Sequence, residues 1–477
     1  MEKVGLSLKK IALLIAYCIL LNPYSVGCAE DVKEPSVAGT FYPSDKKELR
    51  EMIEGFLSMA EKSQRDGRLI AMISPHAGYR FSGQVAAYGY KEIKDSGIKK
   101  VILIGPSHHV GFKGASVYTK GSFRTPLGDV KIDGKLAAGL LSEAADIRFY
   151  PEAYKEEHSL EVQLPFLQEV LKDFMIVPIL VGLPTKQTFD HLISGLAEIL
   201  DDKTLIIASS DLSHYHDYAK AKEMDGKIIS AIERLSVMDA AQLFQNGEAE
   251  MCGSFPVIIA MEAAKRYGAT YGVLFKAANS GDVIGEKDRV VGYASLGIFR
   301  SPFTEEEKKE LLTLARNSIL EQVMNGKAPE VELKNRKLRA DGAVFVTIKE
   351  KGSLRGCIGH VQAIMPLYQS VMKNAVAACS GDPRFAPMNK EDLKDMEIEV
   401  SILSPLTPVK DVKDIRVGRH GLVIRKGMQS GLLLPQVPIE FGWDRETFLE
   451  QLCAKAGLPE GSWKDADLYS FTAEIIK

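Results

Sequence analysis

Leu69-Ile70-Ala71-Met72-Ile73 leads into Ser74-Pro75-His76-Ala77-Gly78-Tyr79, an apolar run that ends in a polar loop carrying a histidine. Residues 101–104 likewise precede Gly105-Pro106-Ser107-His108-His109, and residues 205–208 precede Ser209-Ser210-Asp211-Leu212-Ser213-His214. Short aliphatic runs stopped by Gly, Pro or Ser are typical of buried parallel strands. Because ligands bind beyond the carboxyl ends of such strands, the pattern predicts a functional site at one edge of a sheet.

The composition is that of a soluble globular protein. The chain has 477 residues, of which 45% are hydrophobic and 26% charged, with a formal net charge of −3. This length favours a chain of two to four domains. The charge balance gives no reason to expect nucleic-acid binding.

The first 29 residues differ from the rest of the chain. Lys3, Lys9 and Lys10 precede an apolar run over residues 11–21, and small residues follow up to Ala29. Eleven apolar residues are too few to span a bilayer, so we expect a secretory signal over residues 1–29 rather than an uncleaved anchor. Gly27-Cys28 also resembles the end of a bacterial lipobox, which implies lipidation of Cys28. The predicted location is therefore outside the cytoplasm, in the periplasm or on a membrane as a lipoprotein.

Beyond this leader, the cysteines are few and scattered. They are Cys252, Cys357, Cys379 and Cys453. Their spacing does not suggest a disulfide framework, and it contains neither a C-x-x-C pair nor a trio suited to an iron–sulfur cluster. A buried or metal-bound role is therefore attractive for some of them.

Two domains are expected, with a boundary at 300–304. Residues 30–300 alternate strand-like and helical stretches, which favours an α/β fold. Residues 301–477 begin with a capping box at Thr304 and Glu307, and contain a hairpin that turns at Lys351-Gly352, which favours an α+β fold. The helices expected in the first domain cover residues 45–61, 85–94, 160–171, 188–200 and 219–234, and its strands cover 69–73, 101–104, 175–181, 205–208, 271–277 and 290–299.

His76 and His108 lie at equivalent strand ends, so both can approach one metal ion. A third ligand could come from Asp211, His214, His158 or Cys252. Cys252 lies at a predicted loop-to-helix junction, where a helix dipole would lower the pKa of its thiol. Asp211 and His214 could instead orient a group and act as general acid or base. The alternative for each histidine is an ordinary hydrogen-bonded or surface role.

These residues carry a resemblance to a known family. The motifs recur in the order in which they are found in the Memo family, which is similar in fold to class III extradiol dioxygenases. They are Gly39-Thr40-Phe41-Tyr42-Pro43, Pro75-His76-Ala77-Gly78-Tyr79, Gly105-Pro106-Ser107-His108-His109, Arg124-Thr125-Pro126-Leu127, Glu157-His158-Ser159, Ser210-Asp211-Leu212-Ser213-His214 and Cys252-Gly253.

The resemblance implies that His76, His108 and Cys252 hold one metal ion, with the catalytic residues Asp211 and His214 beside it. Extradiol dioxygenases use a carboxylate where Cys252 stands here. A thiol at this position therefore argues against ring-cleaving dioxygenase activity and favours redox chemistry with iron or copper. Zinc is a further candidate for the bound ion. No nucleotide cofactor is expected.

In the second domain, Leu354-Arg355-Gly356-Cys357-Ile358-Gly359 and Asp382-Pro383-Arg384-Phe385 resemble an AMMECR-type domain. Arg355 and Cys357 could bind an anionic group, although Cys357 could also be a small core residue. Microbial Memo and AMMECR proteins are often encoded with a radical-SAM protein in the AmmeMemoRadiSam grouping. The resemblance therefore implies a separate radical-SAM partner.

The leading hypothesis is a metal-dependent oxidoreductase of the AmmeMemoRadiSam system. In it, His214 is the acid or base, Asp211 orients His214, and Arg355 or Cys357 contributes to substrate binding. The substrate would be a small molecule or a peptide. A non-catalytic peptide-binding scaffold and a metal-handling protein are the competing hypotheses.

Overall fold

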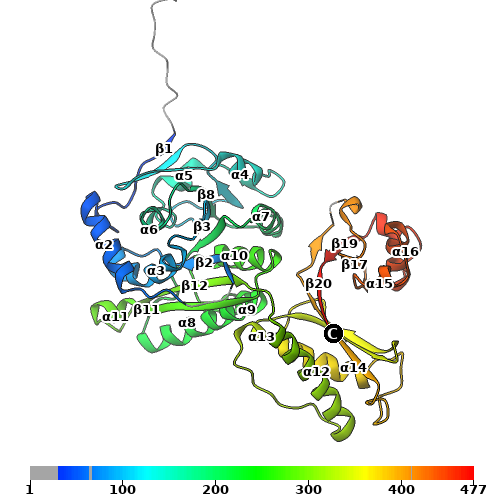
Figure 1. Cartoon of the computed structure of the whole chain (residues 1–477). Coiled ribbons are helices and arrows are strands. Elements are labelled where there is room, and N and C mark those ends of the chain that lie inside the picture. Colours follow the sequence, from blue (N-terminus) through cyan, green and yellow to red (C-terminus); the bar gives the residue numbers. More distant parts are fainter. Residues whose placement is uncertain (1–30, 64–66, 410) are drawn as a thin grey trace, which may run out of the picture.

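A computed structural model describes residues 31–63, 67–409 and 411–477. Two bodies follow each other along the chain, the first from β1 (Val32–Lys33) to β12 (Val290–Arg300) and the second from α12 (Glu305–Asn325) onward (Figure 1). The predicted signal segment and Cys28 lie outside the described residues. Within the described residues, no helix is long and apolar enough to cross a membrane.

The first body is built on a nine-stranded sheet. Its centre is parallel, in the order β2–β9–β3–β8, and β12 adds to β2 in the antiparallel sense. The central strands are buried almost throughout, which confirms the reading of their apolar runs as core strands. These strands are β2 (Arg68–Ser74), β9 (Thr204–Ser209), β3 (Lys100–Pro106) and β8 (Met175–Val181).

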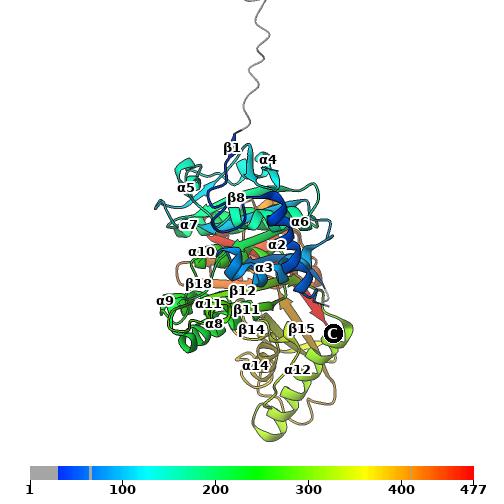
Figure 2. The ribbon, with the colours of Figure 1, turned by 90° about the vertical axis from the view of Figure 1, so that its left-hand side faces the viewer.

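Helices cover both faces of this sheet, as expected for an α/β fold. One face carries α2 (Lys46–Met59), α3 (Tyr79–Ile93) and α6 (Leu164–Val170), which pack against one another (Figure 2). The other carries α7 (Lys186–Ile199), α8 (Tyr218–Glu233), α9 (Val237–Gln245) and α10 (Ser254–Arg266). Helix α2 begins where the Asp45 carboxylate accepts the N–H groups of Lys47 and Glu48, and it buries Leu49, Ile53 and Leu57.

Several short elements complete the first body. The strands of two to four residues among them were not predicted, because so few residues carry no readable alternation. The longer strand over residues 271–279 confirms the one expected over 271–277. These elements are β4 (Ala115–Val117), β5 (Ser122–Thr125), β6 (Gly128–Lys131), α4 (Gly134–Gly139), β7 (Ile147–Arg148), α5 (Pro151–Lys155), the 3₁₀ helix Glu161–Gln163, β10 (His214–His216), β11 (Tyr271–Asn279) and α11 (Ser280–Ile284).

The second body contains two four-stranded antiparallel sheets. The predicted hairpin is confirmed, because Lys351 and Gly352 both have positive φ (50° and 78°) between β13 and β14. The capping box of Thr304 and Glu307 that opens α12 is confirmed as well. The remaining α-helices and strands are α13 (Arg336–Arg339), β13 (Ala343–Glu350), β14 (Ser353–Gly359), α14 (Leu367–Ser380), β15 (Met396–Leu403), β16 (Thr407–Pro408), β17 (Gly421–Lys426), β18 (Gln429–Leu433), α15 (Val437–Glu440), α16 (Arg445–Lys455), β19 (Asp467–Phe471) and β20 (Ala473–Ile476).

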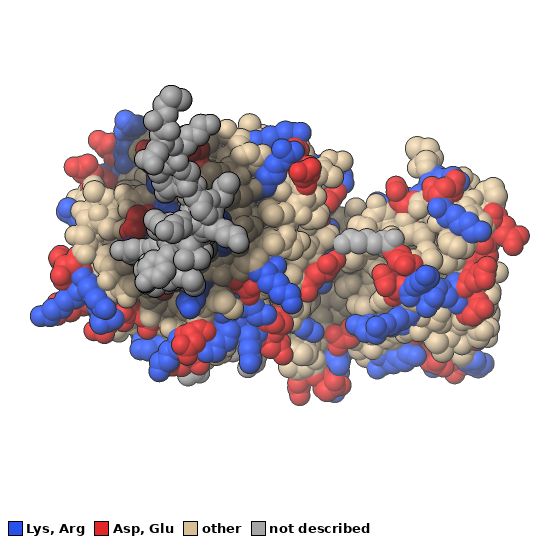
Figure 3. Space-filling model, turned by 90° about the horizontal axis from the view of Figure 1, so that it is seen from above, with Lys and Arg blue, Asp and Glu red and all other residues tan. Residues whose placement is uncertain are grey.

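The second body joins the first at the edge of the sheet opposite His76. Strand β12 runs antiparallel to β2 and pairs Arg300 with Arg68, at the amino end of β2. Just beyond Arg300, the Lys337 ammonium group donates to the carbonyl of Pro302 at 2.8 Å. Seen from above, acidic and basic side chains are interspersed over both bodies (Figure 3). This junction differs from the expectation that the second domain supplies groups to the first domain's site, since His76 follows the carboxyl end of β2.

Candidate metal centre

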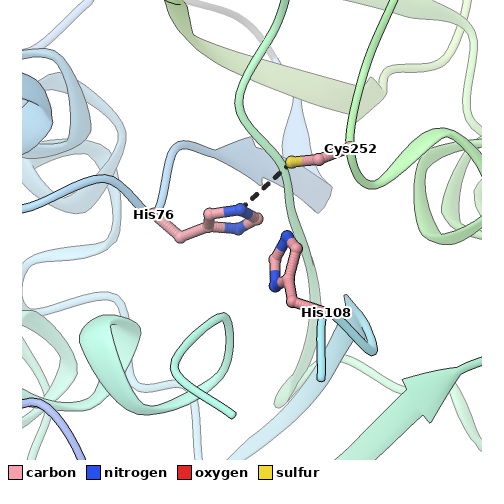
Figure 4. A group of neighbouring side chains, drawn as sticks. All are labelled: His76, His108 and Cys252. Atoms are coloured by element: carbon pink, nitrogen blue, oxygen red, sulfur yellow. Dashed lines mark hydrogen bonds between the residues drawn. The ribbon is translucent and has the colours of Figure 1, made fainter. Parts of the chain in front are cut away.

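Three side chains from separate elements meet at the carboxyl edge of the central sheet. His76 follows β2, His108 follows β3, and Cys252 precedes α10. Each offers one potential ligand atom, and these atoms lie within 4.8 Å of one another. Figure 4 shows the two imidazole rings and the sulfur directed toward a common space. The arrangement follows from strand topology, since parallel neighbours deliver their following loops to one edge.

The protonation of His76 is fixed by a buried serine. The Ser209 hydroxyl donates its single proton in a hydrogen bond to the carbonyl of Ser159 at 2.6 Å and accepts a hydrogen bond from the Gln163 amide at 2.8 Å. Its contact with His76 Nδ1 at 2.9 Å therefore needs the proton to be on Nδ1. The other ring nitrogen, Nε2, keeps its lone pair and lies 3.1 Å from the sulfur of Cys252.

His108 is oriented by a buried carboxylate. Glu157 accepts the backbone N–H of His108 at 2.6 Å and lies 2.9 Å from its Nδ1. Proton donation from Nδ1 to a carboxylate leaves Nε2 free as a metal ligand, which is how such histidines are commonly held. Both histidines thus present Nε2 to the same space.

Glu157 is itself secured by its surroundings. Its side chain is almost fully buried and accepts the backbone N–H groups of His158 and Ser159 at 3.0 and 2.8 Å. Burial alone would raise the pKa of Glu157, but the hydrogen bonds from the His108 side chain and from the backbone outweigh it and lower this pKa to about 2. The sequence marks Glu157 only as part of a motif. Its role in orienting His108 could not be predicted, because it depends on a contact between residues far apart along the chain.

The thiol of Cys252 differs from the prediction for a helix junction. Burial, followed by the charge of Asp211, raises the pKa of Cys252 to about 12. The backbone N–H of Asp211 donates to the sulfur at 3.2 Å, but this does not offset the burial. A thiol in such surroundings loses its proton when a cation binds.

Asp211 also differs from its predicted role. Its carboxylate accepts the backbone N–H groups of His76 and Ala77 at 2.8 and 3.3 Å, so it holds the loop of a candidate ligand rather than orienting His214. Burial raises the pKa of Asp211 to about 7 against these hydrogen bonds. His214 is half-buried at the start of β10, and burial lowers the pKa of its imidazole.

His158 adds a third imidazole to the cluster. Its ring stacks on His108 at 4.7 Å between centroids and meets the edge of His76 at 5.4 Å. Together with His108 and Glu157 it forms a second group of closely spaced potential ligand atoms. Burial lowers the pKa of His158 to about 4 and that of His76 well below its usual value, so both rings are neutral at pH 7.

The segment carrying Phe41 forms a wall of the site. The Glu161 carboxylate binds the Lys33 ammonium and the Tyr42 hydroxyl, both at 2.7 Å, and it accepts the backbone N–H of Ser36. This fixes residues 33–42 over the sheet edge, where the ring of Phe41 lies 4.8 Å from that of His158. This contact could not be predicted from the sequence, because Lys33 and Glu161 are far apart along the chain.

The candidate residues of the second domain are engaged in local structure. Arg355 pairs with Asp392 at 2.9 Å and donates to the carbonyl of Ala386, so it is not free for the predicted anion. The backbone N–H of Cys357 donates to Asp382, and burial raises the pKa of the Cys357 thiol. The guanidinium that lowers this pKa is that of Arg384, not Arg355.

Comparisons with known proteins agree with these two bodies. The family model described as Memo-like protein matches residues 33–297, and the AMMECR1 model matches residues 312–476. A MEMO1 family protein of Methanopyrus kandleri is 39% identical over 280 residues, which cover 56% of this chain and 99% of the relative. One of Aquifex aeolicus is 39% identical over 268 residues, covering 56% and 98%.

Among solved structures, the crystal structure of an uncharacterized protein, PH0010, from Pyrococcus horikoshii is 40% identical, with a TM-score of 0.36. The match covers 36% of this chain and 92% of that one. The chain belongs to the Memo family through its first domain and carries an AMMECR1 domain after it.

Proposed function

We propose that the first domain is a metal-dependent redox enzyme that holds one iron or copper ion, with zinc as the alternative. The observation that carries the proposal is the pair of Nε2 lone pairs on His76 and His108, aimed at the space beside the thiol of Cys252. Neutral imidazoles and a thiolate are donors that suit these ions. Three protein ligands are the number found in catalytic sites with a position open to substrate.

Iron or copper, when bound, would supply a Lewis acid and a centre for one-electron chemistry, whereas zinc would supply a Lewis acid alone. The residues around it would perform the remaining tasks. Glu157 and Ser209 fix the two imidazoles, and Asp211 fixes the loop of His76. His214 would exchange a proton with the substrate, since a half-buried neutral imidazole can accept one at neutral pH.

Metal content is the test of this proposal. Anaerobically purified protein should carry about one ion per chain by mass spectrometry, and His76→Ala and Cys252→Ser should lose it. His191→Ala changes a histidine on α7, outside the cluster, and should keep the ion. A wild type without tightly bound metal after reconstitution would refute the proposal and leave the peptide-binding scaffold as the leading function.

His214→Ala separates catalysis from metal handling. The variant should retain its ion, because His214 is not among the three proposed ligands, while oxygen uptake with an accepted substrate should fall. If the variant behaves like the wild type with every substrate that the wild type turns over, then His214 is not the acid or base. A protein that binds the ion reversibly and turns over no substrate would be a metal-handling protein.

Export and partnership belong to the same proposal. We propose that the protein acts outside the cytoplasm, anchored through Cys28 or released, and that a radical-SAM protein shares its task. Cell fractionation of the wild type and of Cys28→Ala tests the first point, because loss of lipidation should move the protein from the membrane to the soluble fraction. Co-purification with the radical-SAM protein tests the second point.

A further inference from the structure

A cleft of about 780 Å³ lies between the two domains. Its wall includes Arg266, Gly268 and Arg300 from the first domain and Arg425, Tyr469 and Thr472 from the second. Since Arg300 is paired with Arg68 at the amino end of β2, the cleft opens at the edge of the sheet opposite the metal centre. It is therefore separate from the site described above.

The acidic side chains of this cleft already have basic neighbours. Asp190 pairs with Lys186 at 2.5 Å, Glu262 with Arg266 at 3.5 Å, and Glu474 with Lys308 at 3.3 Å. Asp341 interacts with the charges of Lys265 and Arg234. The Lys337 ammonium of the same wall is likewise neutralised, by Glu307 at 2.5 Å.

Two arginines remain without a carboxylate. Arg300 lies over the ring of Tyr267 at 5.2 Å, and Arg425 lies over the ring of Tyr469 at 5.3 Å. Neither guanidinium has an ion pair or a side-chain hydrogen bond with any other residue that the structure describes. A guanidinium carries five N–H donors in a planar fork, which suits a planar or tetrahedral oxyanion.

The position of Arg300 is built into the fold. The guanidinium groups of Arg300 and Arg68 lie 5.2 and 5.9 Å from the centre of the Tyr267 ring. The next residue, Gly268, has a φ of +100°, and a Cβ atom added there would lie 3.4 Å from Nε of Arg300. The ring of Tyr267 and the backbone of Gly268 thus lie beside the guanidinium at the wall of the cleft.

We propose that this cleft binds a small anion bearing a phosphate or carboxylate groups, held between Arg300 of the first domain and Arg425 of the second. Neither guanidinium makes an ion pair among the described residues, although Asp467 stands opposite Arg425 in the β17–β19 ladder, so both can bind such a ligand. Hydrogen bonds to charged partners are the strong ones. Because each domain supplies one arginine, the bound anion draws the two domains together. The ligand site is independent of the metal ion.

Calorimetric titration of the full chain with inorganic phosphate and with succinate, at constant ionic strength in chloride, tests the proposal. At least one of the two anions should bind saturably, and the one that binds more tightly identifies the ligand as phosphate-bearing or carboxylate-bearing. Arg300→Gln and Arg425→Gln should each weaken binding about tenfold or more. Arg300→Lys keeps the charge without the guanidinium fork, so its affinity should fall between those of the wild type and Arg300→Gln.

Two variants control for the loss of charge. Arg148→Gln and Arg419→Gln remove arginines that do not line the cleft, one from each domain, and should bind as the wild type does. The melting temperature without ligand and the metal content show whether each variant is folded. The absence of saturable binding of both anions to the wild type would overturn the proposal, as would equal weakening by the control variants.

Discussion

At the scale of single residues, the candidate metal centre depends on where two protons lie. Ser209 and Glu157 each accept a hydrogen bond from the Nδ1–H group of one histidine. The Nε2 lone pairs of His76 and His108 therefore face the same space. The sulfur of Cys252 completes this donor set. The ligands are therefore prepared before an ion arrives, apart from the thiol, which still has to lose its proton.

Replacing Glu157 by glutamine should weaken metal binding by about 10- to 100-fold, because partners of this kind contribute that much to affinity. Glutamine has one acceptor oxygen where Glu157 has two. It cannot satisfy both the donors on Oε1, which are Nδ1 of His108 and the backbone N–H groups of His158 and Ser159, and the backbone N–H of His108 on Oε2. Competition with a chelator measures the affinity. Glu156→Gln, a change of the exposed neighbour, should have no effect, and equal effects of both changes would argue against the orienting role of Glu157.

The affinity for the ion should rise with pH. Burial keeps the Cys252 thiol protonated at pH 7, with a pKa of about 12, whereas His76 and His158 are already neutral. Binding to the thiolate then releases one proton, so the affinity should increase about tenfold per pH unit between pH 7 and 8.5. Chelator competition at several pH values measures this slope. The residual binding of Cys252→Ser should have a flatter slope, and a wild-type affinity independent of pH would exclude loss of a thiol proton on binding.

At the scale of elements, the site lies at a point where strands end and backbones approach closely. Gly253 connects the Cys252 loop to α10 and lies against the end of β9. A Cβ atom at Gly253 would lie 2.5 Å from the carbonyl oxygen of Ser209 and 2.7 Å from Cβ of Ser210. The absence of a side chain at Gly253 is therefore what lets the sulfur reach the two histidines.

Gly253→Ala should destabilise the protein by about 1–3 kcal/mol, because the contact with β9 forces backbone shifts. It should also reduce the metal content, since the same shift moves Cys252 away from the histidines. Urea unfolding and mass spectrometry provide the two measurements. Gly226→Ala, within α8 and with no atoms near the added methyl group, should stabilise the protein by about 0.5–1 kcal/mol and keep the ion. An alanine at position 253 that leaves stability and metal content unchanged would contradict this account.

The same elements indicate how much of the protein could be predicted from its sequence. The central strands, the hairpin at Lys351-Gly352 and the helix opened by Thr304 were predicted, because each has a local signal in periodicity, turn chemistry or capping. The short strands β4 to β7 have no such signal. The roles of Ser209 and Glu157 could not be predicted, because they arise from contacts between residues far apart along the chain.

At the scale of the whole molecule, two bodies share one chain but not one site. The metal centre lies beyond the carboxyl end of β2, whereas the AMMECR1 domain is attached near the amino end of that strand. Arg355 is paired with Asp392 within its own domain. The link between the domains is therefore expected to run through their junction and the cleft beside it, and not through a composite active site.

A matched pair of cysteine variants in the full chain tests this independence. Cys252→Ser should abolish tight metal binding, because it removes one of three ligands. Cys357→Ser changes a half-buried thiol that accepts a hydrogen bond from the Thr347 hydroxyl of the neighbouring strand at 3.3 Å, while the backbone N–H of Cys357 donates to Asp382 within the same domain. It should leave the metal content and the metal affinity within about twofold of the wild type, since distant sites without shared partners act additively. Mass spectrometry and chelator competition on the two proteins measure the metal content and the metal affinity.

Loss of the ion in Cys357→Ser, with its folding intact by circular dichroism, would mean that the second domain reaches the metal centre. The two bodies would then have to close around the metal edge of the sheet, in an arrangement different from the one described here.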